Sequence, residues 1–220
     1  MSLDDSDAPW PRLFIELLDQ HSVADAAHDL EHIRRVVRNA RQLAQAEQAD
    51  WLIVMPAAWL HDCLIIPKTS PDRHQASRLA ARQAVAWLGE NGWPHGRLNE
   101  IAHAIEAHSF TAGITPLTPE AKVLQDADRL DALGAVGLAR TLMLGGEMRR
   151  PFYQPEDPFC DSRDANDTLY TLDHVFRKLL TLEGTMQTRA GREEAHRRTE
   201  FLRQFLTQLR QEISGNEFTL

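Results

Sequence analysis

The segment from Trp51 to Ile66 constrains the fold more than any other part of the sequence. It reads WLIVMPAAWLHDCLII, an almost continuous apolar run in which His61 and Asp62 are the only acidic or basic side chains. A transmembrane helix needs about 20 apolar residues, and this run is shorter and contains Pro56 as well as the polar pair. We therefore expect a buried core helix here and no membrane span.

The rest of the chain shows helical periodicity, and no set of alternating segments indicates a β-sheet. Besides the apolar segment, we expect helices at residues 14–18, 28–47, 72–90, 98–108, 119–131, 169–182 and 193–213. The helix at residues 119–131 is expected to begin at Thr118-Pro119 and to bend or break near Gly134 and Gly137. The sequence thus predicts an all-α fold, a compact multi-helix domain over residues 1–220, with helices of residues 169–214 packing on it.

Residues 145–167 form the longest stretch without helical periodicity. Gly145 and Gly146 open it, and Pro151, Pro155 and Pro158 follow. Irregular segments of this length inside a domain are usually functional, so we expect a lid or a partner surface.

The composition excludes some classes of function. The chain has a formal net charge of −8, which argues against general nucleic-acid binding but leaves a nucleotide substrate open. Cys63 and Cys160 form no disulfide framework, and the acidic N-terminus does not resemble a signal peptide. These features favour a cytoplasmic protein without a membrane partner.

His61 and Asp62 are the first candidates for chemistry. A carboxylate buried without a partner costs several kcal/mol or becomes protonated, so something must satisfy Asp62. A core His–Asp pair, a polar patch that reaches solvent, and a bound metal would each do so, and this segment alone does not choose between them.

Two further groups of side chains could complete a metal site. His28 and His32 lie four residues apart, beside the apolar stripe of the expected second helix. The run Asp126 to Asp131 brings several carboxylates. About 200° separates Asp126 from Asp128 on a helix, so periodicity does not decide which of them faces inward.

Three segments in this order resemble motifs of the HD-domain phosphohydrolase superfamily: HDLEHIRRV, AAWLHD and QDADRLDALGAVGLAR. The similarity extends to AIEAHSF and KLLTLEGTMQTRAGR and is greatest to the stand-alone bacterial branch that includes YedJ and YpgQ. It spans nearly the whole chain.

This resemblance implies a role for individual residues. The resemblance assigns four residues as metal ligands: His32, His61, Asp62 and Asp128. It also implies catalytic roles for Asp62 and His108. Possible phosphate contacts in the substrate-binding site are Arg129, Lys68, Lys178 and Arg189, and further metal ligands could come from His28, His74, His103 or His108. Two imidazoles and two carboxylates suit Mn²⁺, Mg²⁺, Fe²⁺, Ni²⁺ or Co²⁺.

The expected function is metal-dependent hydrolysis of a phosphoester or phosphoanhydride, with a nucleotide pyrophosphohydrolase as the more specific form. The expected partners are a small-molecule phosphate or nucleotide and a second copy of the chain in a homodimer. Two alternatives stay open: a catalytically inactive protein that binds a nucleotide or a partner, and an oxygenase with two metal ions.

Overall fold

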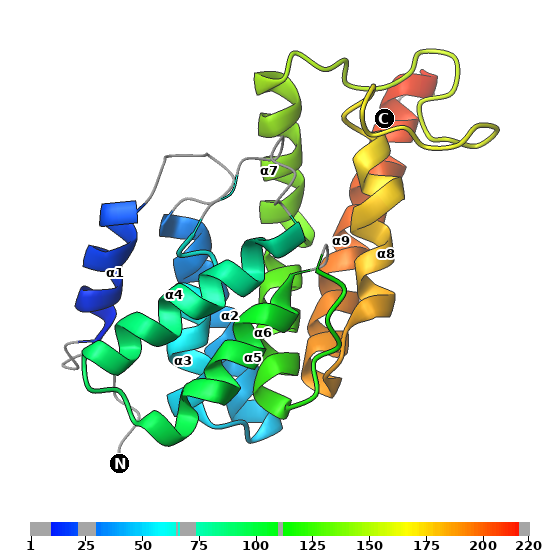
Figure 1. The fold of residues 1–220 in the computed structure, drawn as a ribbon. Helices are drawn as coiled ribbons and strands as arrows, with labels where there is room; N and C mark the ends of the chain where they lie inside the picture. The colour runs from blue at the N-terminus through cyan, green and yellow to red at the C-terminus, as the bar shows by residue number, and fades with distance from the viewer. Residues whose placement is uncertain (1–9, 22–29, 65, 67–73, 110–111, 216–220) are drawn as a thin grey trace. The chain divides into compact units, whose positions relative to one another are not determined.

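The computed structural model describes residues 10–21, 30–64, 66, 74–109 and 112–215, and within these ranges it is helical without a β-strand (Figure 1). The predicted all-α class is therefore confirmed. The chain divides into two compact units, residues 1–128 and 129–220, which are described separately here. The expectation of one domain over residues 1–220 stays a prediction.

The first unit is built around the short apolar helix α3 (Trp51–Leu60). Helices α2 (Leu30–Glu47) and α5 (Leu98–His108) pack against it, and α1 (Trp10–His21) and α4 (Ala76–Glu90) add smaller contacts. On α2, the buried apolar face includes Ile33, Val36, Ala40 and Ala44.

Helix α3 ends at Leu60, six residues before the predicted end at Ile66. Asp50 caps its start by accepting a hydrogen bond from the Leu52 amide at 2.9 Å. After Leu60 the chain turns, and the Cys63 amide donates to the Leu60 carbonyl at 3.1 Å. The His-Asp pair consequently lies at the end of the helix and not within it.

A cluster of aromatic rings packs between α3 and its neighbours α1 and α4. Phe14 of α1 lies 6.2 Å from Trp59 of α3 and 5.7 Å from Trp87 of α4, measured between ring centroids. Trp93 joins them between α4 and α5, packing edge-on against Trp10 at 4.6 Å. These contacts attach α1 and α4 to the helix whose end carries His61.

Helix α6 (Pro119–Asp131) begins at the predicted proline, where Thr118 Oγ1 accepts from the Ala121 amide at 3.1 Å. The predicted break follows, and α7 (Gly134–Glu147) starts at Gly134 with a φ of +69°. A left-handed backbone of this kind favours glycine. Gly137 lies inside α7 and causes no break.

The second unit corrects two predicted boundaries. Helix α7 runs through Gly145 and Gly146 to Glu147, so the irregular segment begins at residue 148 and not at 145. Residues 169–172 are not helical, and helical structure starts only at Asp173, with a π-type turn at Val175–Leu179, then α8 (Leu180–Leu182). Helix α9 (Arg189–Ser214) begins earlier than predicted because Thr188 accepts from the Gly191 amide at 2.9 Å.

Ion pairs connect the irregular segment to the helical structure that follows it. The buried carboxylate of Asp173 accepts two hydrogen bonds from Arg163, at 2.5 and 2.8 Å. Arg210 of α9 makes a similar double contact with Asp161, at 2.7 and 2.9 Å, and stacks on Phe159. The predicted role of this segment as a lid or partner surface stays a prediction.

Among the described helices, none is long and apolar enough to cross a bilayer. This finding agrees with the expectation that the Trp51 segment is a core helix.

Candidate metal centre

His61 is held at the C-terminal end of α3 by its own helix. Its Nδ1 lies 2.9 Å from the Ala58 carbonyl, so this nitrogen is the one that donates a proton. The Nε2 atom is then left with a lone pair that points away from the helix. The side chain is completely buried, and this Nε2 has no hydrogen-bond partner within the described part of the chain.

Burial lowers the pKa of His61 to about 4, against the opposing effect of the Asp62 carboxylate. The ring is therefore neutral at pH 7. A buried, neutral imidazole nitrogen without a partner is costly in a protein interior, and a metal ion would satisfy it.

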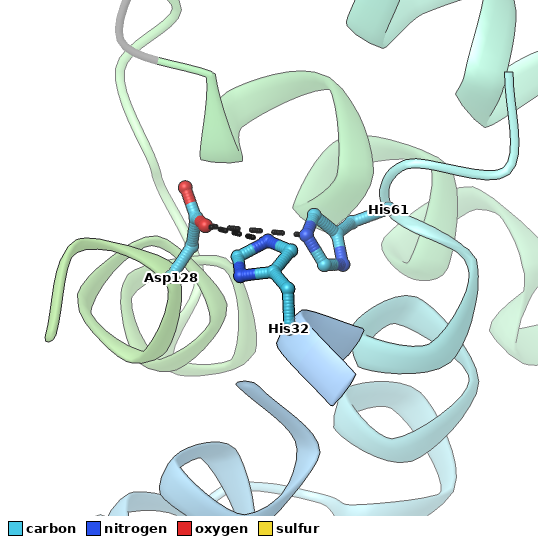
Figure 2. Close-up of side chains that lie close together, drawn as sticks. All are labelled: His32, His61 and Asp128. Atoms are coloured by element: carbon cyan, nitrogen blue, oxygen red, sulfur yellow. Dashed lines mark ion pairs between the residues drawn. The ribbon is translucent and has the colours of Figure 1, made fainter. Parts of the chain in front are cut away.

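Three more donor atoms face this nitrogen. Asp62 Oδ2 lies 3.7 Å and Asp128 Oδ1 lies 4.0 Å from His61 Nε2. His32 Nε2 lies 3.5 Å from the same Asp128 oxygen and 4.0 Å from the same Asp62 oxygen. Figure 2 shows the rings of His32 and His61 and the Asp128 carboxylate turned toward one another.

These separations suit a shared ion. Divalent metals bind nitrogen and oxygen donors at about 2.0–2.2 Å, so two donors of one ion lie about 3–4 Å apart. His32, from α2, and His61 are buried, whereas the Asp62 and Asp128 side chains are 26% and 29% exposed. The donor set thus has a dry side formed by imidazoles and a side open to solvent formed by carboxylates.

His108 extends the cluster from the end of α5. Its Nδ1 lies 2.6 Å from the Ile105 carbonyl, and its Nε2 lies 3.6 Å from Asp62 Oδ1, the carboxylate oxygen not shared with His32. Burial alone would lower the pKa of His108, but Asp62 and Asp128 outweigh it and raise that pKa above its usual value. His61, Asp62 and His108 form a second group of donors with metal-like spacing.

Asp126 and Asp128, which helical periodicity could not distinguish, have different surroundings in the structure. Asp128 lies among the imidazoles, whereas Asp126 is fully buried and belongs to neither donor group found in the described residues. Asp131, the third acid of the run, is bound by Arg140 at 2.5 Å. The assignment of His32, His61, Asp62 and Asp128 as ligands remains a prediction that this geometry favours.

The other predicted site residues have varied surroundings. Arg129 Nη1 donates to the Thr185 carbonyl at 2.7 Å, and Arg189 pairs with Glu193 at 2.6 Å. Lys178 is exposed on the π-type turn, and Lys68 lies outside the described residues. These three described residues belong to the second unit, and all four phosphate contacts stay predictions.

The histidines that were expected as further metal ligands also lie in different surroundings. His103 Nε2 accepts a hydrogen bond from the Leu117 amide at 3.0 Å, so this ring supports a loop. His28 lies outside the described residues, and His74 belongs to neither donor group among those that are described.

Sequence reasoning missed two side-chain amides next to the candidate ligands. Asn39 Nδ2 donates to the Ala127 carbonyl at 3.1 Å, and Gln125 Nε2 donates to the Ala107 carbonyl at 2.7 Å. In the sequence, these two residues stand out only by lying on the same helices as His32 and Asp128. Many other residues also lie there, so this does not single them out.

The chain is similar to known proteins over most of its length. The HD domain family matches residues 29–133, the part of the chain that holds all five clustered side chains. The YpgQ protein of Bacillus subtilis (strain 168) is 35% identical over 194 residues, which is 86% of either chain.

Solved structures are similar over almost the whole length. An HD-superfamily hydrolase from Bacillus thuringiensis has a TM-score of 0.70 at 31% identity and covers 91% of this chain and 93% of its own. Bacillus subtilis YpgQ in complex with ADP also has a TM-score of 0.70, at 33% identity, covering 92% of this chain and 95% of its own.

Proposed function

Because the chain belongs to the HD domain family, we propose that it is a phosphohydrolase that depends on a divalent metal held by His32, His61, Asp62 and Asp128. The convergence of these four side chains from distant parts of the sequence carries the proposal. The ion would be Mn²⁺, Mg²⁺, Fe²⁺, Ni²⁺ or Co²⁺, since a donor set without thiolate selects weakly among them.

When bound, such an ion polarises a phosphoryl oxygen and lowers the pKa of a coordinated water towards about 7. The protein supplies orientation and proton transfer. The Nδ1 contacts of His61 and His108 with carbonyls three residues earlier fix both rings and direct each Nε2 into the cluster. Asp62 presents one oxygen to His32 and His61 and the other to His108, so it is placed to accept a proton from the attacking water.

His108 is the proposed proton donor or phosphate contact. Its raised pKa favours a proton on Nε2, which faces the more exposed carboxylate side of the cluster. A protonated imidazole there can donate to a phosphoryl or leaving-group oxygen.

The proposed substrate is a phosphoester or phosphoanhydride, and a nucleotide in particular. The ADP complex of YpgQ supports this choice, since that protein is similar over nearly the full chain. Cleavage of a nucleotide phosphoanhydride would make the protein a nucleotide pyrophosphohydrolase. Arg129, Lys68, Lys178 and Arg189 are the proposed contacts with the substrate phosphates.

The test is an activity screen of metal-stripped protein. Each of the five ions is added in turn to a panel of nucleoside mono-, di- and triphosphates and a generic phosphodiester. We expect turnover with at least one ion, and a loss of at least about 10³-fold in His61→Ala, because a ligand of the reacting centre is removed.

His103→Ala is the matched control, since His103 also lies on α5 but contacts the Leu117 amide and belongs to neither donor group. It should keep most of the activity, whereas His108→Ala should lose it. Tight nucleotide binding with no product, unchanged by His61→Ala, would overturn the proposal and favour the inactive binding protein.

A further inference from the structure

Gln125 is a buried amide that the proposed chemistry does not use. It lies on α6 with 3% of its surface exposed, and its Nε2 donates to the Ala107 carbonyl, 18 residues away, at 2.7 Å. The reverse orientation of the amide would place its oxygen against the carbonyl oxygen, so the assignment of nitrogen and oxygen follows from the contact itself.

The amide is only half satisfied. Within the described residues, Gln125 Oε1 is buried and has no hydrogen-bond partner. Burying an unpaired acceptor costs free energy that an apolar side chain of the same length would avoid. A role confined to filling space therefore does not explain a glutamine here, and the donated hydrogen bond is the contact that does.

That hydrogen bond joins the backbones beside two candidate site residues. Ala107 immediately precedes His108 and lies in the last turn of α5, where carbonyls lack a donor from their own helix. Gln125 is three residues before Asp128, about one turn away on α6. The bond thus connects the helix end that carries His108 to the helix that carries Asp128.

We propose that Gln125 is a positioning residue of the metal centre, which fixes Asp128 on α6 against the end of α5. Because α5 packs against α3, the bond also sets the spacing of Asp128 from the ligands at the end of α3. This inference rests on the proposed function, since it needs a bound ion. Apolar contacts along α6 are non-directional and tolerate sliding, whereas a buried 2.7 Å hydrogen bond fixes one register. Donors of one ion must be held to within a few tenths of an ångström, so a change of register should weaken binding.

The experiment measures the Mn²⁺ dissociation constant of metal-stripped protein by isothermal titration calorimetry. Gln125→Met keeps the length and the apolar volume but removes the donor. We expect Mn²⁺ to bind about 10-fold more weakly, at the lower end of the effect of residues that orient metal ligands. Gln125→Asn retains an amide that is one methylene group too short, and it should weaken binding in the same direction if Gln125→Met does not fold.

Leu88→Ala separates positioning from general destabilisation. Leu88 is completely buried in α4 and is not one of the donors, so this variant should unfold more easily and yet bind Mn²⁺ as the wild type does. Binding by Gln125→Met that matches the wild type, or that changes no more than in Leu88→Ala, would overturn the positioning role alone. If Mn²⁺ does not bind the wild type, or binds His61→Ala equally well, the proposed function and this inference are overturned together.

Discussion

His61 and His108 are neighbours with opposite protonation behaviour. Their ring centroids lie 4.9 Å apart, and each ring bonds the carbonyl three residues earlier through Nδ1. Burial dominates at His61 and lowers its pKa to about 4, whereas at His108 the nearby carboxylates outweigh burial and raise the pKa. One cluster thereby contains a lone pair suited to a cation and a ring that keeps its proton to a higher pH than a free imidazole does.

At this scale, the metal-free protein should lose stability in acid because of His61. Its pKa is about 6.5 in the unfolded chain and about 4 in the folded one, so the unfolded state binds more protons between these values. Stability therefore falls as the pH drops from 6.5 towards 4, and His61 alone should contribute a loss of about 2 kcal/mol between pH 7 and pH 5.

Urea unfolding of metal-stripped protein at the two pH values measures this loss. His61→Gln has no titrating group at this position, so it should lose about 2 kcal/mol less than the wild type. Equal losses in the two proteins would contradict the buried, neutral state of His61.

At the scale of elements, a close approach explains why α7 continues through two glycines. A Cβ atom on Gly145 would come within 3.0 Å of Thr171, whereas one on Gly146 would meet nothing within 4 Å. Gly145 thus allows α7 to pack against the segment that follows the irregular stretch. From sequence alone, Gly145-Gly146 indicated a loop, because close packing of this kind leaves no local pattern.

Gly145→Ala should therefore destabilise the second unit by about 1–3 kcal/mol, the usual result of overpacking. Gly146→Ala is the matched control on the same helix, and there alanine should be neutral or stabilise by up to about 1 kcal/mol through its better helix propensity. Thermal unfolding of both variants tests the pair. Similar unfolding midpoints for the two variants would show that the close approach at residue 145 does not require glycine.

At the scale of the whole molecule, the candidate centre gathers donors that are up to 96 positions apart in sequence, from His32 to Asp128. An ion bound there favours the folded state by mass action. Mn²⁺ at about 100 times its dissociation constant should add about 2.7 kcal/mol to the free energy of unfolding of residues 1–128.

Differential scanning calorimetry should show the midpoint rising with Mn²⁺ and returning after addition of a chelator. His61→Ala should abolish the rise, and His103→Ala should retain it, because His103 bonds the Leu117 amide. A rise that persists in His61→Ala would place the ion elsewhere.

The sequence predicted most of this molecule but not all of its details. The all-α class and the starts of α5 and α6 follow from periodicity and from Thr118-Pro119, which are local signals. The end of α3 at Leu60 was missed, since the sequence stays apolar beyond the point where the backbone turns. Local signals also leave Asp126 and Asp128 equivalent, and only packing in three dimensions directs Asp128 toward His32.

The positions of His61 and His108 at the ends of α3 and α5 also affect the order in which ligands can arrive. The C-terminal ends of α3 and α5, each with a partial negative charge, carry His61 and His108 beside the Asp62 carboxylate. Without a cation, the two carboxylates and the two helix ends disfavour an anion at this site, and His108 opposes them only in part, so a phosphate compound should bind there weakly. Binding should accordingly be ordered, with the metal ion first and the phosphate compound second, and the metal-free protein should bind its substrate weakly.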